Sequence, residues 1–329
     1  MESLLPFEKI KREIFIRKHA ETSPKFGKRP EERTTKEHLH LGIVNIDKPA
    51  GPTSHQISGY VRQMLHLDKA GHSGTLDPNV TGVLPVALSD ATKVVQALLP
   101  AGKEYICIMH LHDDYSEEQI RKVCASFIGK IKQLPPLKSA VKREWRYRKI
   151  YYLDVLEVDG RDVLFRVGCQ AGTYIRKLCA DIGIALGSNG HMQELRRTKA
   201  GCFGEDNLCT MHDLADAFWY WKHENNDTLL RKYVFPLERA VAHLPKIWVF
   251  DTTVDSLCHG ASLKVPGISK IESEIQVDDF VAIMTLKDEL VAFGKVHMIS
   301  KDIQKKDKGL AVKVERVFMN TGVYPKISV

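Results

Sequence analysis

The chain has 329 residues, of which 43% are hydrophobic and 27% are charged, and its formal net charge is +7. This length corresponds to about two domains, and the composition is typical of a soluble protein with a hydrophobic core. No segment approaches 18 consecutive apolar residues, and the charged N-terminus lacks the apolar stretch of a secretory signal. The seven cysteines are odd in number and form no CxxC pair, which argues against a disulfide framework and a thiolate zinc site.

Residues 1–40 are polar, with ten basic and seven acidic residues, and we expect an extension that another surface must order. The first strand is predicted at 42–46, followed by a loop rich in proline and glycine at 47–53. Thr53, with Gln56 three residues later, has the pattern of a helix N-cap, and the helix is expected to continue to about Leu65.

The middle of the chain alternates predicted strands and helices. In chain order, the predicted elements are a loop at 69–82, a strand at 83–88, a helix from about Ser89 and a strand at 103–112. A helix from Ser116 to about Ile128, a hairpin of 148–158 with 162–169, and a helix at 172–187 that stops at Gly187 follow.

From Ile247 onward the sequence consists of short alternating strands separated by turns, which predicts a small β-barrel. The fold class is therefore α+β, with a mixed α/β domain followed by this barrel. We expect three regions: an extension at 1–40, a large domain at 41–245, and a small domain at 246–329.

The loop at 69–82 carries the most unusual composition. Its glycines at 71, 74 and 82 allow a ligand to approach the backbone closely, and Pro78 restricts Asp77 to an extended conformation. The loop would thus present a carboxylate from a stiff support, although Asp-Pro alone is also an ordinary turn.

Basic residues concentrate between 135 and 152, where six lysines and arginines accompany one acidic residue. The aromatic residues Trp145, Tyr147, Tyr151 and Tyr152 are interleaved with them. Cations neutralise phosphates and aromatic faces stack on unpaired bases, so RNA is the favoured partner, against the alternative of a solvated strand edge. A second basic cluster, at 194–199, supports the same interpretation.

Polar side chains also occur on predicted apolar elements. Tyr105 lies on a strand, while Tyr174 and Arg176 fall in the first turn of a helix, where an arginine opposes the helix dipole unless a carboxylate pairs with it. His110 and His112, followed by two aspartates, resemble metal ligands, but no third ligand follows at a suitable spacing, and we predict no metal site.

These motifs together resemble the TruB-type pseudouridine synthases. The matching segments are GIVNIDKPAGPTSH, GHSGTLDPNVTGVLPVAL, KEYICIMHL, GTYIRKLCADIGIALG and HMQELRR, in the same order. QLPPLKSAVKREWRYRKIYYLDVLE is similar to the dyskerin-like branch, the catalytic proteins of H/ACA guide ribonucleoproteins, and HGASLKVPGI and DDFVAIMTLKDELVAFGKV are similar to that branch's PUA domain. In this branch the N-terminal extension packs on the PUA domain.

The resemblance implies roles for individual residues. Asp77 matches the essential aspartate, Tyr105 the tyrosine that stacks on the target base, and Arg176 the arginine that pairs with the aspartate. Leu195 matches an apolar residue of the uridine pocket. Substrate RNA contacts are expected at His72, Tyr174, Lys142, Arg143, Arg146 and Arg148, and guide RNA contacts at His259, Gly260, Ala261, Pro266 and Gly267.

The resemblance implies an enzyme that isomerises uridine to pseudouridine, without a cofactor, under the direction of an H/ACA guide RNA. Its partners would be the guide and substrate RNAs and three small proteins: Nop, Gar and a kink-turn-binding ribosomal-type protein. A stand-alone synthase acting on the T-loop of transfer RNA and a non-catalytic RNA scaffold are the alternatives. The chain lacks a lysine-rich tail of the nucleolar type, so an archaeal-type cytoplasmic location is expected.

Overall fold

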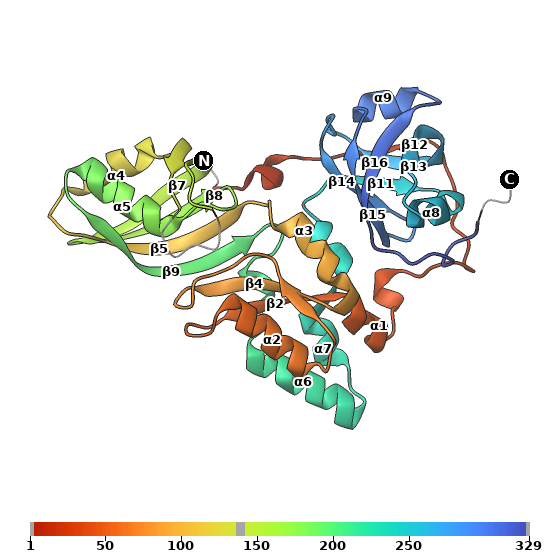
Figure 1. Cartoon of the computed structure of the whole chain (residues 1–329), viewed down its shortest axis with the longest axis horizontal. Helices are drawn as coiled ribbons and strands as arrows, with labels where there is room; N and C mark the ends of the chain where they lie inside the picture. The colour runs from red at the N-terminus through yellow and green to blue at the C-terminus, as the bar shows by residue number, and fades with distance from the viewer. Residues whose placement is uncertain (1–2, 136–141, 327–329) are drawn as a thin grey trace.

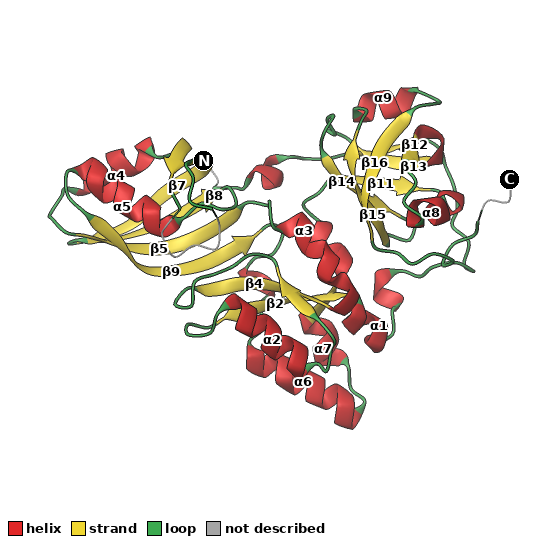
Figure 2. Ribbon diagram, viewed as in Figure 1, coloured by secondary structure: helices red, strands yellow, loops and turns green. Residues whose placement is uncertain are grey.

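The computed structural model describes residues 3–135 and 142–326. Two β-sheets organise the chain, one in a large domain and one in a smaller C-terminal module (Figures 1 and 2). The expected order, a mixed α/β domain followed by a compact β-module, is what the structure contains.

The large domain is built on a nine-stranded sheet with the order β10-β2-β4-β9-β5-β8-β7-β6, and β3 pairs with β4 beside this path. The strands are β2 (Gly42–Lys48), β3 (Ala70–His72), β4 (Thr81–Leu88), β5 (Lys103–Leu111), β6 (Gly129–Gln133), β7 (Arg146–Asp159), β8 (Asp162–Cys169), β9 (Gly190–Ala200) and β10 (Val234–Pro236). Neighbouring strands are antiparallel except β4 and β9, which pair in parallel where Gly82 meets Arg197. β9, which our sequence analysis did not predict as a strand, therefore joins the two halves of the sheet.

Helices cover the two halves separately. They are α1 (Thr35–His40), α2 (Ser54–Met64), α3 (Val95–Leu98), α4 (Glu117–Ser126), α5 (Ile175–Leu186), α6 (Met211–Glu224) and α7 (Thr228–Tyr233). One apolar core joins α2 and α6 to β2 and β4, and a second joins α4 and α5 to β5, β7 and β8. In Figure 1 the first group lies below and the second to the left.

The predicted helix ends are confirmed in detail. The Thr53 hydroxyl accepts from Gln56 N, Ser116 caps α4 in the same way, and Gly187 ends α5 with a φ of 99°. The segment after Ser89 differs, because it begins as a 3₁₀ helix (Ser89–Val94) before the short α3.

The C-terminal module is a seven-stranded sheet with the order β1-β13-β11-β14-β15-β16-β12. Its elements are β1 (Ile14–Ile16), β11 (Lys246–Val249), α8 (Asp251–Cys258), β12 (Leu263–Lys264), β13 (Ile268–Glu272), β14 (Phe280–Met284), β15 (Leu290–Val296), α9 (Ser300–Lys305) and β16 (Leu310–Val317). The strand β13 and the helices α8 and α9 are not predicted from the sequence.

The N-terminal segment lies against both domains. Its strand β1 pairs antiparallel with β13 of the C-terminal module. Nearer the N-terminus, Leu5 is fully buried, and Glu8 forms an ion pair with Lys199 of β9. A bidentate pair between the buried Arg33 and Glu238 fixes the end of the segment, and the same Glu238 carboxylate accepts from Leu290 N of the module. A continuous apolar core then joins the two domains.

Candidate active site

Asp77 lies on the segment 73–80, which joins β3 to β4 and is called the Asp77 loop below. Two side chains hold this loop from within. The Nζ of the fully buried Lys48 donates to the carbonyls of Pro49, Pro78 and Val80, at 2.8, 2.8 and 2.9 Å. The Ser54 hydroxyl accepts from Leu76 N at 2.8 Å. The loop is therefore stiff because its backbone is bound on both sides of the carboxylate.

Asp77 faces Arg176, which lies in the first turn of α5. The Nε of Arg176 is 3.1 Å from Oδ2 of Asp77, and its Nη2 is 3.4 Å from Oδ1. Both side chains remain nearly half exposed, at 45% and 46%. The expected carboxylate partner for this arginine is present, and it orients the carboxylate without closing off access.

Tyr105 and Leu195 extend the site onto the sheet. Tyr105 on β5 lies between Val167 of β8 and Arg197 of β9, and Leu195 lies two residues before Arg197 on β9. Both side chains pack, partly buried, against the apolar core beneath α5. Burial raises the pKa of the Tyr105 hydroxyl, and the Arg197 guanidinium opposes that change.

His72 and Tyr174 lie at the borders of the site. His72 ends β3, and its Nδ1 accepts from Gly74 N at 3.3 Å, while burial lowers the pKa of its imidazole. Tyr174 is the N-cap of α5, and the Gln133 side chain bonds to both its N–H and its carbonyl. Gln133 thus connects the helix that carries Arg176 to the strand β6.

The second basic cluster is largely buried or paired within the fold, and RNA binding there stays a prediction. Arg197 is buried, Arg196 forms ion pairs with Asp47 and Glu205, and Lys199 pairs with Glu8. The sequence showed the charges but not their partners, which come from β2 and from the distant N-terminal segment.

The first basic segment is different, because its described part is largely exposed. Lys142 pairs with Glu144, Arg143 donates to the Pro135 carbonyl, and Arg146 donates to the Lys142 carbonyl. Arg148 is half-buried and lies over the turn at Gly172. Lys138, also part of the predicted cluster, lies outside the described residues.

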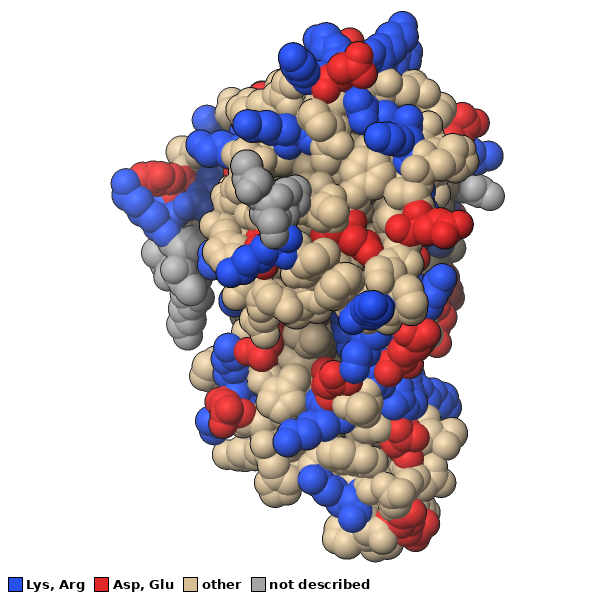
Figure 3. All heavy atoms as spheres, turned by 90° about the vertical axis from the view of Figure 1, so that its right-hand side faces the viewer, with Lys and Arg blue, Asp and Glu red and all other residues tan. Residues whose placement is uncertain are grey.

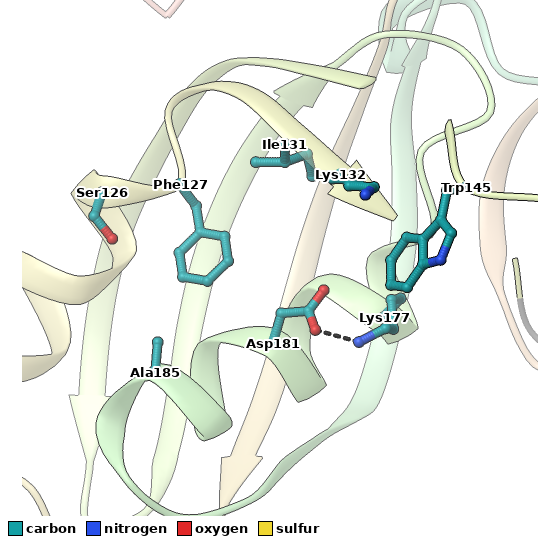
Figure 4. A pocket seen from close by; sticks show the side chains of 8 residues that line it. All are labelled: Ser126, Phe127, Ile131, Lys132, Trp145, Lys177, Asp181 and Ala185. Atoms are coloured by element: carbon teal, nitrogen blue, oxygen red, sulfur yellow. Dashed lines mark hydrogen bonds and ion pairs between the residues drawn. The ribbon is translucent and has the colours of Figure 1, made fainter. Parts of the chain in front are cut away.

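Two exposed aromatic rings of this segment form cation–π contacts with lysines of the neighbouring strand β6. Lys130 lies 4.2 Å from the ring centre of Tyr147, and Lys132 lies 4.9 Å from that of Trp145. Trp145 and Lys132 also border a pocket of about 350 Å³ between β6 and α5 (Figure 4). Asp181 and Lys177 of α5 form an ion pair at this pocket, which contains none of the predicted catalytic side chains.

The residues expected to bind guide RNA gather at one end of the C-terminal module. His259 follows the end of α8, with its Nδ1 2.8 Å from the Asp255 carbonyl oxygen, and its side chain is about half exposed. Gly260 and Ala261 continue as an exposed turn, and Pro266 and Gly267 form a 3₁₀ turn packed on α8 at Thr253. Figure 3 shows that basic and acidic side chains are interspersed over this side of the molecule.

The structure places a third histidine near the pair that resembled metal ligands. His191 of β9 lies opposite His110, with ring centres 5.4 Å apart, and its Nδ1 is 3.1 Å from His112 Nε2. Even so, within residues 3–135 and 142–326 no group of three or more His, Cys, Asp or Glu side chains is arranged to hold a metal ion. The seven cysteines are free thiols, and no helix in the described part of the chain is long and apolar enough to cross a membrane.

An α+β domain with an aspartate on a stiff loop, an arginine partner and a strand tyrosine, followed by a small β-module, defines the class of RNA-modifying enzyme that the motifs indicated. Comparisons with known proteins agree. Residues 62–175 match the TruB family pseudouridylate synthase N-terminal domain, 176–242 the tRNA pseudouridylate synthase B C-terminal domain, 245–318 the PUA domain and 2–58 the DKCLD (NUC011) domain.

Full-length relatives support the same family. The proteins named probable tRNA pseudouridine synthase B from Pyrococcus furiosus and Methanopyrus kandleri are each 55% identical, over 98% of this chain and 96% and 95% of their own lengths. A chain in the crystal structure of a Cbf5-Nop10-Gar1 complex is 55% identical, with a TM-score of 0.94 over 98% of this chain and 99% of that one. A chain in a structure of an H/ACA RNP bound to a substrate RNA containing 2′-deoxyuridine is 52% identical, with a TM-score of 0.92 and the same coverage.

The chain therefore belongs to the TruB family of pseudouridine synthases. The predicted fold class, a mixed catalytic domain followed by a PUA domain, is confirmed, as is the predicted enzyme class.

Proposed function

We propose that this chain isomerises uridine to pseudouridine in RNA as the catalytic subunit of an H/ACA guide ribonucleoprotein. One observation carries this proposal: 98% of the chain superimposes on a chain of a Cbf5-Nop10-Gar1 complex, with a TM-score of 0.94, and on a chain of an H/ACA RNP bound to a substrate RNA, with a TM-score of 0.92. Its expected partners are accordingly the guide and substrate RNAs, Nop, Gar and a kink-turn-binding protein. Since the relatives compared above are archaeal, we place the complex in the cytoplasm.

The reaction breaks the N1–C1′ bond of uridine, turns the base and forms a C5–C1′ bond, while C5 loses a proton and N1 gains one. The reaction is an isomerisation, with no change of oxidation state and no added group, so it requires charged side chains in fixed positions rather than an oxidant or reductant. We assign Asp77 to the sugar side, where C1′ becomes electron-poor, and Arg176 to orienting that carboxylate. Tyr105 and Leu195 would contact the uracil, with His72 and Tyr174 at the borders of the pocket.

The target base must leave its stack, which costs a few kcal/mol unless the RNA is unpaired. The exposed basic and aromatic side chains at 142–149 fit a single-stranded RNA, because their cations meet phosphates and their rings meet unstacked bases. We propose that Lys142, Arg143, Arg146 and Arg148 bind substrate RNA there. The turn from His259 to Gly267 would contact the guide RNA, since its exposed side chains and small residues admit a nucleotide closely.

A stand-alone transfer RNA synthase is the second candidate, because the relatives carry the name tRNA pseudouridine synthase B. The two differ in their need for a guide. A non-catalytic scaffold is the third, and it predicts salt-sensitive RNA binding without turnover.

The test is tritium release from RNA labelled at uridine C5, with and without a matching guide RNA and the partner proteins. Release that depends on the guide, and a loss of at least about 1,000-fold in Asp77→Asn, is the expected result. Asp114→Asn is the matched control, because Asp114 also pairs bidentately with an arginine, Arg161, but away from the site. Equal release without the guide would favour the stand-alone enzyme, and RNA binding without release would favour the scaffold.

A further inference from the structure

Arg197 is a buried cation beside the site, and the roles proposed above do not use it. Its side chain is 1% exposed, yet none of its contacts within the described residues is a carboxylate. Its neighbour Arg196, by contrast, pairs with two carboxylates. An arginine keeps its charge in proteins, so β9 places a fixed positive charge inside the large domain.

Backbone carbonyls of the Asp77 loop and of β4 hold the Arg197 guanidinium in place. Its Nε donates to the Val83 carbonyl at 2.7 Å, and its Nη2 donates to the Gly74 carbonyl at 3.3 Å. The main chain beneath it is equally constrained, because Gly82 of β4 lies so close that an added Cβ would be 2.2 Å from the Arg197 carbonyl oxygen. The guanidinium therefore has little freedom to move relative to the Asp77 loop.

The side chain that faces this charge is Tyr105. The two residues are register partners on β5 and β9, which lie side by side (Figure 1). Burial raises the pKa of Tyr105 and lowers that of Arg197, and each group favours the ionised form of the other against these shifts. The other titratable groups that influence this pair are Asp77, Cys169, Lys48, His72 and Lys103.

Removing a guanidinium from water without an anion to pair it costs several kcal/mol, which two carbonyl bonds offset only in part. An apolar side chain would fill the same space without that cost. The arrangement is thus poorly explained by stability alone, whereas an anion that forms transiently at Tyr105 would complete it.

We infer that Arg197 is a positioning residue for Tyr105, which orients the tyrosine hydroxyl and stabilises the tyrosinate that forms during the proton transfer. The inference rests on the proposed function. When the N1–C1′ bond breaks, its electron pair stays on N1 and takes the proton of the Tyr105 hydroxyl, which leaves a tyrosinate beside Arg197. After the C5–C1′ bond forms, the C5–H bond breaks: the tyrosinate takes the proton, and the electron pair restores the C5–C6 double bond. Tyr105 ends the cycle unchanged.

The experiment compares single-turnover rates of the guided complex on RNA carrying hydrogen or deuterium at the target C5, across pH. The variants are Arg197→Met, Arg197→Gln, Arg197→Lys, Tyr105→Phe and the double variant that combines Arg197→Met with Tyr105→Phe. We expect Arg197→Met to slow turnover about 10-fold or more, to increase the isotope effect at C5 and to move the rate profile to higher pH. Arg197→Lys, which keeps the charge, should restore part of the rate, and Arg197→Met should add no further loss in the Tyr105→Phe background. Arg196→Met is the matched control, with an unchanged isotope effect.

An unchanged isotope effect in a folded Arg197→Met, or losses that add fully to those of Tyr105→Phe, would overturn the inference. If Arg197→Met does not fold, Arg197→Gln provides the same comparison, because it keeps hydrogen-bond donors and loses only the charge. Failure of the proposed function is distinguishable, since the wild-type complex would then show no guide-dependent turnover at all.

Discussion

Replacing Lys48 with methionine should separate the position of the Asp77 loop from its chemistry. Methionine fills nearly the same volume as lysine, so the apolar packing around the stem is kept, and the change is confined to the three bonds from Nζ to carbonyl oxygens. Two of those carbonyls belong to Pro78, which follows Asp77 in the loop, and to Pro49, which follows β2; both residues are exposed.

The expected magnitude follows from these contacts. Hydrogen bonds from a charged donor contribute about 1.5–3 kcal/mol each, and the cost of burying the ammonium, several kcal/mol, offsets much of their sum. The exposed Pro49 and Pro78 can be rehydrated, which leaves the Val80 carbonyl as the main buried group without a partner. We therefore expect a loss of about 2 kcal/mol in the free energy of unfolding, or a fall in Tm of roughly 4–8 °C. Because a displacement of about 1 Å can reduce turnover about 100-fold, kcat should fall about 10- to 100-fold.

The assay is tritium release at saturating RNA, together with thermal unfolding of the same preparation. Lys287→Met is the matched control, because Lys287 of the PUA domain also donates to three backbone carbonyls, those of Ser23, Phe26 and Gly27 in the N-terminal segment, away from the site. That control should lower Tm and leave kcat unchanged. Equal kcat in wild type and Lys48→Met would show that the loop keeps its position without this anchor, and the reasoning would be refuted.

Two further changes test the structure around the site. Burial lowers the pKa of His243 to about 4 in the native chain. Between pH 6.5 and 4 the unfolded chain therefore binds a proton that the native chain does not. The free energy of unfolding should fall by up to about 3 kcal/mol as the pH drops through this range. Urea unfolding at several pH values should show a weaker pH dependence in His243→Gln, and equal slopes would refute this assignment. Gly82→Ala should lower the free energy of unfolding by more than about 3 kcal/mol, because Gly82 has a φ of +99° and an added Cβ would collide with the Arg197 carbonyl. Gly129→Ala is the control: Gly129 has a φ of +109° but lies in open space, so only about 1 kcal/mol of backbone strain is expected. Similar denaturation midpoints for the two alanine variants would contradict the predicted collision.

Local signals in the sequence were sufficient for much of the fold. The capped helices, the hairpin across Asp159–Gly160 and the stop at Gly187 depend on residues a few positions apart, and all are present. β9 was missed because its charged residues do not alternate with apolar ones, and its strand conformation depends on pairing with β5 and β4. The PUA helix α8 was missed because its β-branched residues weaken the helical pattern.

The site shows the same limit. An arginine in the first turn of a helix indicated a carboxylate partner, and Asp77 provides it across 99 residues of sequence. The roles of Lys48 and Arg197 could not be predicted in this way, because their partners are backbone carbonyls, which leave no mark in the sequence. For the same reason the sequence alone does not distinguish Arg197 from surface cations, although the side chain is buried inside the domain.

The use of carbonyls as partners has a consequence for the electrostatics of the pocket. Lys48, Lys103 and Arg197 are all buried near the Asp77 loop, and each is held by backbone carbonyls rather than by carboxylates. A buried carboxylate partner would neutralise each charge and would also compete with Asp77 for Arg176. Carbonyl partners fix these groups in place but leave their charge uncompensated. Burial lowers the pKa of Lys103 to about 7, so the positive field of the pocket at neutral pH rests chiefly on Arg197 and Lys48. Such a field favours the groups that carry negative charge there: the Asp77 carboxylate, the phosphates of the RNA and a base that has just lost its bond to C1′.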